Sequence, residues 1–194
     1  YQLQKPHKFK YMTEEIIIAG FGGQGVLSMG KILAYSGIMQ DQEVSWMPSY
    51  GPEMRGGTAN VTVIISDERI SSPVLTRFDT AIILNQQSMD KFESQVKPGG
   101  TLIYDPNGIT HHPTRQDINI YRIEGARLAA ESGNPKIFNM IILGGFLKVK
   151  PIVKIENVEK GLQKSLPPRH HNLIPMNIEA IQTGMNHIET ANQL

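Results

Sequence analysis

A cluster of glycines directly after a short apolar run constrains the fold of this chain more than any other feature. The run covers residues 15–19, and Gly20, Gly22 and Gly25 follow it in the order G-x-G-x-x-G, ahead of a stretch with helical periodicity. Isoleucines that run together without alternating polar residues are typical of a strand buried on both faces. Glycines at the end of such a strand permit a tight turn into a helix. We therefore predict a strand, a glycine turn and a helix, which begin a β-α-β unit.

The rest of the 194-residue chain alternates between apolar runs and amphipathic stretches that are separated by Gly and Pro. The expected strands are residues 15–19, 43–47, 61–66, 80–85, 101–104 and 118–123, and the expected helices are residues 26–39, 88–96, 124–132, 138–149, 158–166 and 174–188. In the first helix the predicted inward positions are Leu27, Ile32, Leu33 and Ile38. We predict a single α/β domain over residues 13–190, a Rossmann-like three-layer sandwich with a mostly parallel sheet. Residues 1–12 are expected to be an extension or a remnant of cloning.

The composition limits the kinds of partner and chemistry. Lys and Arg number 19 against 18 Asp and Glu, so a net charge of +1 predicts neither nucleic acid nor membrane as a partner. The chain has no cysteine, which excludes disulfides, a thiolate nucleophile and cysteine-ligated iron–sulfur or zinc sites within it. No apolar run approaches the roughly 20 residues of a membrane span, so we expect a cytoplasmic protein.

The glycine turn has a functional and a structural interpretation. Backbone N–H groups beside a helix N-terminus can bind a phosphate, whereas glycines can also serve only a tight turn and close packing. A dinucleotide site additionally requires an Asp or Glu about 20 residues further on, at the end of the second strand. That place is occupied by residues 46–49, while Glu43 lies at the wrong end of the strand and Glu53 lies beyond it. The residues therefore argue against NAD or FAD.

A second stretch, residues 45–63, combines features that are unusual in a surface loop. Trp46 and Tyr50 prefer burial, so we expect something to cover them. In one interpretation the loop folds back on its own sheet, with Glu53 and Arg55 as an internal ion pair. In the other it is an interface or ligand platform, with the Arg55 guanidinium directed at a carboxylate or phosphate.

Three stretches in this order resemble a known family. They are GFGGQGVLSMGKILA (residues 20–34), WMPSYGPEMRGGTANVTVIISDERISSP (residues 46–73) and VKPGGTLIYD (residues 96–105). Together they are similar to the gamma subunit of 2-oxoacid:ferredoxin oxidoreductases, of the 2-oxoglutarate and branched-chain 2-oxoacid type. The resemblance implies an enzyme complex that decarboxylates a 2-oxoacid with thiamine diphosphate and Mg²⁺. Electrons would pass to iron–sulfur clusters and ferredoxin, and coenzyme A would leave as acyl-CoA together with CO2.

The resemblance also implies a division of labour. Thiamine diphosphate and the clusters belong to alpha and beta subunits or to a small ferredoxin-like delta subunit, so no cofactor is assigned to this chain. The gamma chain would be accessory, inactive in isolation, and placed near the subunit interface and the path of coenzyme A. The absence of cysteine agrees with that division. The substrate acid, and whether the isolated chain is a monomer or a homodimer, stay open.

Two sets of site residues carry over from the resemblance. The glycine turn supplies Gly20, Gly22, Gly23, Gln24 and Gly25, which would contact a phosphate of coenzyme A or a neighbouring subunit. The second stretch supplies an interface or ligand loop that consists of Trp46, Tyr50, Gly51, Glu53, Arg55, Gly56, Gly57 and Asn60. We assign no catalytic residue and no metal ligand, because the pairs His111–His112 and His170–His171 lack companions at ligand spacing.

Two other classes of function compete with this interpretation. A stand-alone nucleotide-binding protein with a Rossmann-like fold would bind NAD or FAD without a partner. A self-associating interaction domain would form oligomers and respond to no nucleotide.

Overall fold

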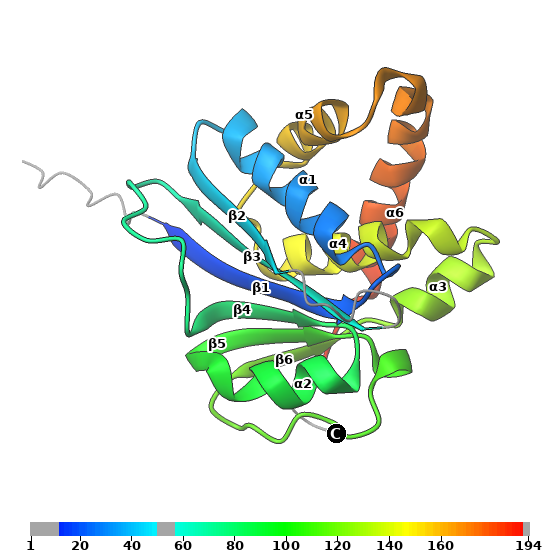
Figure 1. Ribbon diagram of the computed structural model, residues 1–194. Coiled ribbons are helices and arrows are strands. Elements are labelled where there is room, and N and C mark those ends of the chain that lie inside the picture. Colours follow the sequence, from blue (N-terminus) through cyan, green and yellow to red (C-terminus); the bar gives the residue numbers. More distant parts are fainter. Residues whose placement is uncertain (1–11, 50–56, 192–194) are drawn as a thin grey trace, which may run out of the picture.

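Residues 12–49 and 57–191 are described by the computed structural model, in which helices flank a seven-stranded sheet (Figure 1). The strands are β1 (Thr13–Phe21), β2 (Glu43–Ser49), β3 (Thr58–Ser66), β4 (Phe78–Ile83), β5 (Val96–Tyr104), β6 (Asn119–Arg122) and β7 (Glu189–Thr190). The α-helices are α1 (Val26–Met39), α2 (Gln86–Phe92), α3 (Gly125–Glu131), α4 (Phe138–Val149), α5 (Ile155–Ser165) and α6 (Ile174–His187). The short 3-10 helices are η1 (Glu93–Gln95), η2 (Pro106–Gly108), η3 (Pro135–Ile137) and η4 (Pro168–Leu173).

The sheet has the strand order β2-β3-β1-β4-β5-β6-β7. β1, β4, β5 and β6 pair in parallel, which confirms the predicted α/β fold with a mostly parallel sheet. β3 runs antiparallel between β1 and β2, and β7 runs antiparallel to β6. The β1-α1-β2 unit therefore exists, but its two strands do not touch because β3 lies between them.

The two faces of the sheet are covered unequally. One face packs against α1, α4, α5 and α6, where isoleucines of β1 such as Ile16 and Ile18 are fully buried. The other face packs mainly against α2, through Ile17 of β1 together with Met89 and Phe92 (Figure 1). Since successive strand residues point to opposite faces, the continuous isoleucine run supplies both cores. The buried-strand prediction for residues 15–19 is confirmed.

Several element boundaries differ from the prediction. Helices α1 and α4 begin and end where the sequence predicted. β2 continues through Pro48 to Ser49 and β3 begins at Thr58, so both strands are longer than expected and fewer residues separate them. Proline is tolerated there because β2 is an edge strand. The prediction that Ile38 faces inward is wrong: it is 48% exposed, at the outer edge of α1. The boundaries at residues 12 and 190 remain predictions.

The helical layer depends on close contact between α4 and α6. A Cβ atom on Gly144 would overlap the carbonyl oxygen of Ile181, and a Cβ atom on Gly184 would overlap that of Ile141. The predicted buried helix with small residues at residues 138–149 is thereby confirmed. Among the described residues, no helix combines the length and apolarity that crossing a membrane requires.

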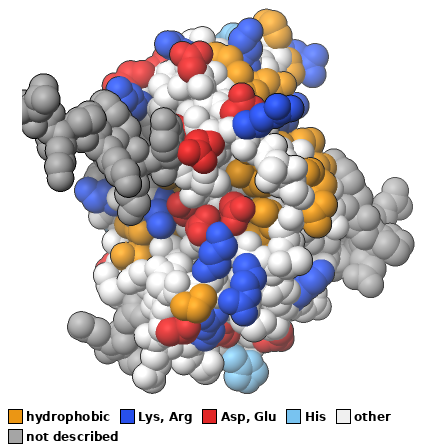
Figure 2. Space-filling view, turned by 90° about the vertical axis from the view of Figure 1, so that its left-hand side faces the viewer, with side chains coloured by type: hydrophobic (Ala, Val, Ile, Leu, Met, Phe, Trp, Pro, Cys, Tyr) orange, Lys and Arg blue, Asp and Glu red, His pale blue; other side chains and the backbone are white. Residues whose placement is uncertain are grey.

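Acidic and basic side chains are interspersed at the amino ends of β1, β4 and β5 (Figure 2). The Lys97 ammonium lies 2.5 Å from a carboxylate oxygen of Glu15 and 2.9 Å from one of Asp79. These groups are partly exposed, so the network contributes modestly to stability. The glycine turn lies at the opposite end of the strands, where β1 ends.

Candidate functional site

The glycine turn joins the end of β1 to the start of α1. Gly20 and Phe21 end the strand, and Gly23 and Gly25 adopt φ values of 94° and 76°. These left-handed conformations are readily accessible to glycine and strained for other residues. At Gly25 an added Cβ atom would also lie 2.5 Å from Nδ2 of Asn139. The left-handed conformation of the turn therefore favours glycine at both positions, and at Gly25 the contact with α4 adds a second reason.

The Gln24 side chain ties this turn to the sheet. Its Oε1 accepts a hydrogen bond from the Phe21 N–H at 2.6 Å, and its Nε2 donates to the Leu84 carbonyl at 3.2 Å. Both atoms of the amide are thus used within the chain. The side chain fixes the turn against the end of β4, and the contact predicted between Gln24 and a phosphate or another subunit remains a prediction.

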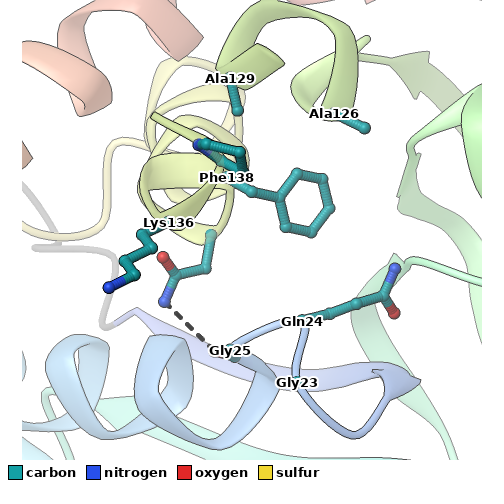
Figure 3. Close-up of a pocket in the computed structure, with 9 residues that line it drawn as sticks. Gly23, Gln24, Gly25, Ala126, Ala129, Lys136 and Phe138 are labelled. Atoms are coloured by element: carbon teal, nitrogen blue, oxygen red, sulfur yellow. Dashed lines mark hydrogen bonds between the residues drawn. The ribbon is translucent and has the colours of Figure 1, made fainter. Parts of the chain in front are cut away.

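A pocket of about 390 Å³ opens above the turn (Figure 3). It is lined by Gly23, Gln24, Gly25, Ala126, Ala129, Pro135, Lys136, Phe138 and Asn139. Figure 3 shows that the Phe138 ring projects from the α4 side into the space above the turn. The pocket lies outside the carboxyl ends of the parallel strands, where open α/β sheets bind ligands.

The electrostatics of the pocket favour an anion. The N-termini of α1 and α4 both border it, and the positive ends of helix dipoles stabilise negative charge. Lys136 adds a cation on the α4 side, and the described residues that line the pocket include no Asp or Glu. A phosphate or carboxylate therefore suits this pocket better than a cation does.

The strand order explains why the ribose-binding acid of dinucleotide enzymes is missing. In those folds the acid ends the strand that lies directly beside β1. Here that place is occupied by β3, which runs antiparallel, and β2 lies one strand further out at the edge. The end of β2 is thereby removed from the glycine turn, in agreement with the sequence argument against NAD or FAD.

Residues 57–60 of the second stretch, which we call the second motif, contact the glycine turn and the end of β1. The Gly22 N–H donates to the Gly57 carbonyl at 3.2 Å, and Asn60 of β3 pairs in register with Ala19 of β1. The two motifs, which α1 separates in the sequence, therefore touch at these residues. Tyr50, Gly51, Glu53, Arg55 and Gly56 lie outside the described residues, so the interpretation of Arg55 is not tested.

Trp46 lies on the edge strand with a part of its ring exposed. It is 37% exposed, and it borders a groove of about 280 Å³ together with Lys31, Ala34, Tyr35, Ile38 and Val44. We call this surface between α1 and β2 the Trp46 groove. The described residues cover its apolar side chains only in part, so the expectation that something covers Trp46 is open.

Sequence reasoning missed one wall of the pocket. Lys136, Phe138 and Asn139 come from the start of α4 and the turn before it, more than a hundred residues from the glycine turn. The dipeptide Asn134–Pro135 marks a helix start, with Asn134 Oδ1 accepting from the Lys136 N–H at 3.2 Å. The Asn134–Pro135 dipeptide predicted a boundary between helices. It could not show that the helix after it begins beside the glycine turn.

The histidine pairs take part in local bonds. His112 Nδ1 lies 3.1 Å from the Tyr104 hydroxyl, and the His171 ring lies 3.0 Å from the Leu166 carbonyl. Within residues 12–49 and 57–191, no three His, Asp or Glu side chains form a group that could hold a metal ion.

The fold and the turn thus define an α/β protein of the Rossmann type with an anion-favouring pocket beside its first strand. Residues 15–187 match the family of pyruvate ferredoxin/flavodoxin oxidoreductases, and the chain belongs to that family. The subunit KorC of 2-oxoglutarate synthase from Methanocaldococcus jannaschii is 36% identical over 159 residues, which cover 80% of this chain and 85% of KorC. The predicted resemblance to gamma subunits is confirmed.

Solved structures show the same architecture. The gamma subunit of a keto/oxoacid ferredoxin oxidoreductase from Geobacter sulfurreducens superposes with a TM-score of 0.77 at 28% identity, covering 91% of this chain and 96% of that one. A chain of 2-oxoglutarate:ferredoxin oxidoreductase from Magnetococcus marinus gives a TM-score of 0.80 at 24% identity, covering 90% of this chain and 30% of that one. The latter likeness shows the fold. The chain is accordingly a gamma-type subunit of a 2-oxoacid:ferredoxin oxidoreductase.

Proposed function

We propose that this gamma subunit serves a thiamine-diphosphate-dependent complex that converts a 2-oxoacid and coenzyme A to acyl-CoA and CO2, and that its pocket binds a phosphate of coenzyme A. The observation that carries the proposal is the pocket above the glycine turn, in which Lys136 and two helix N-termini face a space lined by no carboxylate among the described residues. The Magnetococcus marinus enzyme, which shares the fold, has been solved with 2-oxoglutarate, coenzyme A and succinyl-CoA.

The residues of the pocket fit the chemistry of coenzyme A. Its phosphates would accept hydrogen bonds from the N–H groups at the start of α1 and from the Lys136 ammonium. The apolar side chains of Phe138, Ala126 and Ala129 line the same pocket and suit the uncharged parts of the molecule. In this role the chain binds and orients coenzyme A, and the bond-making steps belong to other subunits.

The remaining cofactors require other chains. Iron–sulfur clusters take thiolate ligands, and this sequence has no cysteine to supply them. Thiamine diphosphate and its Mg²⁺ would likewise be held by the alpha and beta subunits, because the chain lacks the Gly-Asp-Gly motif that typically accompanies that site. We propose that the Trp46 groove contacts one of these partners, together with the interface loop that the sequence predicts.

A substitution of Lys136 tests the coenzyme A site. In the assembled oxidoreductase, Lys136→Ala should raise the KM for coenzyme A about tenfold, because a charge-assisted bond to phosphate is lost. The KM for the 2-oxoacid should stay unchanged, and Lys136→Arg should retain most of the affinity. Steady-state kinetics with each substrate varied in turn measures all three.

The matched control is Lys160→Ala, which removes an exposed lysine on α5, outside the residues that line the pocket. It should leave both KM values unchanged. A Lys136→Ala enzyme with the parent KM for coenzyme A would refute the proposed site.

A further inference from the structure

Asp105 has a buried carboxylate at the carboxyl ends of the parallel strands, where the pocket also lies. It follows β5 directly, ends the stretch VKPGGTLIYD and is 2% exposed. Its Oδ1 accepts from the Asn107 N–H and its Oδ2 from the Ala126 N–H, each at 2.8 Å. Burial raises the pKa of this carboxyl, and the backbone donors act in the opposite direction. A buried carboxylate is costly unless its oxygens are hydrogen-bonded, and both are bonded here.

Helix α3 depends on this carboxylate for its start. The helix has seven residues, too few to be stable by itself in water, and its first N–H groups need acceptors from outside the helix. Its own capping position is Glu124, whose carboxylate bonds to the Arg127 side chain instead. Asp105 therefore caps α3 from a different element of the fold.

The start of α3 forms part of the pocket wall. Ala126, whose N–H bonds to Asp105, lines the pocket, and so does Ala129 one turn later. An added Cβ atom on Gly125 would lie 2.7 Å from Ile142 and 3.3 Å from the Phe138 ring, so α3 packs tightly on the start of α4. A shift of α3 would consequently move Phe138.

The other oxygen of Asp105 binds a segment that packs against the residue after β4. Oδ1 fixes the 3-10 helix η2, and Gly108 of η2 packs against the Leu84 carbonyl so closely that a Cβ atom would overlap it. The same carbonyl accepts the hydrogen bond from Gln24 of the glycine turn. One carboxylate thus joins the α3 wall to the strand end that holds the turn.

We propose that Asp105 is a positioning residue for this pocket: by capping α3 from β5, it holds the wall that faces the glycine turn at the spacing that the ligand requires. The inference rests on the proposed function only in taking coenzyme A as the ligand. Asp105 itself, being buried, touches no substrate.

The test uses the assembled oxidoreductase with Asp105→Ala and Asp105→Asn chains. Asp105→Ala should raise the KM for coenzyme A about threefold to thirtyfold, the range that corresponds to loss of a helix cap, and leave the KM for the 2-oxoacid unchanged. Asp105→Asn should have a smaller effect, because its single oxygen can accept from one of the two N–H groups. Hydrogen exchange of backbone amides should become faster in residues 125–131 and also in residues 135–139.

Asp117→Ala is the matched control, since Asp117 is an exposed aspartate bonded to Arg115 near the start of β6. If exchange in residues 125–131 rises while residues 135–139 and the KM for coenzyme A stay as in the parent, Asp105 stabilises α3 only and the positioning role is overturned. Should the alanine variant fail to fold, the asparagine variant, which keeps the side-chain volume, supplies the same readouts.

The Lys136→Ala enzyme separates this inference from the proposed function. If Lys136→Ala raises the KM for coenzyme A and neither Asp105 variant does, the positioning role fails and the coenzyme A site stands. If Lys136→Ala has no effect, coenzyme A is not the ligand, and the positioning role then stands or falls with the exchange of residues 135–139.

Discussion

Among individual residues, the buried carboxylates of Glu14 and Asp105 are the least expected, because charged side chains usually lie at the surface. Glu14 has a side chain that is only 8% exposed, at the edge of the sheet opposite the pocket. Its Oε1 accepts from the Thr80 hydroxyl at 2.5 Å and lies 3.5 Å from the Lys150 ammonium. Burial raises the pKa of Glu14, although Thr80 and Lys150 act in the opposite direction. Its position was not predictable, because its neighbours come from β4 and the end of α4.

The raised pKa of Glu14 makes stability depend on pH. The folded chain binds this proton more tightly than the unfolded chain, whose carboxyl titrates near 4.5, so this contribution is present below that pH. It is lost as the pH rises from 4.5 through the raised folded pKa. Relative to the parent, Glu14→Gln should therefore gain thermal stability as the pH rises above about 4.5. Melting temperatures of both proteins at several pH values measure this difference.

Glu179→Gln, at an exposed position on α6, is the surface control for that comparison. The opposite sign, a variant that loses stability relative to the parent as the pH rises, would show that the pairing with Lys150 outweighs burial.

Elements differ in how far the sequence determines them. The limits of α1 and α4 were predicted because their signals are local. Apolar residues at helical spacing follow Gly25 in α1, and a largely apolar run follows Pro135 in α4. The glycine turn was predicted for the same reason, since its signal is local. The insertion of β3 between β1 and β2 was not predicted, because strand order depends on pairing between distant segments. The α3 and α4 walls of the pocket escaped prediction for that reason too.

The contact between α4 and α6 gives a prediction for an element pair. Gly144→Ala places a methyl group on the carbonyl of Ile181, and the two helices must separate to accommodate it. Overpacking of this kind should lower the free energy of unfolding by about 1–3 kcal/mol, although alanine is the better helix former. Chemical denaturation followed by circular dichroism measures the change.

The matched control is Glu179→Ala on the exposed face of α6, which should stay within about 0.5 kcal/mol of the parent. Equal stability of the Gly144→Ala protein would mean that the α4–α6 contact yields easily and does not fix the helical layer.

On the scale of the whole molecule, the two sequence motifs serve different surfaces. The glycine turn faces the pocket, whereas Trp46 opens onto the groove between α1 and β2. Among the described residues of the second motif, the Gly57 carbonyl accepts a hydrogen bond from the Gly22 N–H of the turn. The pocket and the groove share no lining residue among those described, so the ligand and the protein partner proposed for them would not compete.

The Trp46 groove gives a prediction about assembly. Trp46→Arg should sharply reduce recovery of the alpha or beta subunit in a pull-down, because a charge would replace the ring at the centre of an apolar contact. The isolated chain should stay folded, because Trp46 is 37% exposed on an edge strand, and it should lose some stability with the buried part of the side chain. Mass spectrometry of the captured proteins and a melting curve provide the two measurements.

Val74→Arg is the control for that experiment, because Val74 is 67% exposed and lies outside the groove. Full recovery of the partners with Trp46→Arg would place the subunit contact elsewhere on the chain.

The antiparallel position of β3 also sets the order in which the chain can fold. Among the strands that the structure describes, β2 pairs only with β3. β1 pairs with β3 on the same side, so that Thr13 lies opposite Ser66. During synthesis β1, α1 and β2 are made before β3, the strand that pairs with both β1 and β2. β1 and β2 therefore cannot be joined into one sheet through β3 until residues 58–66 have been synthesised.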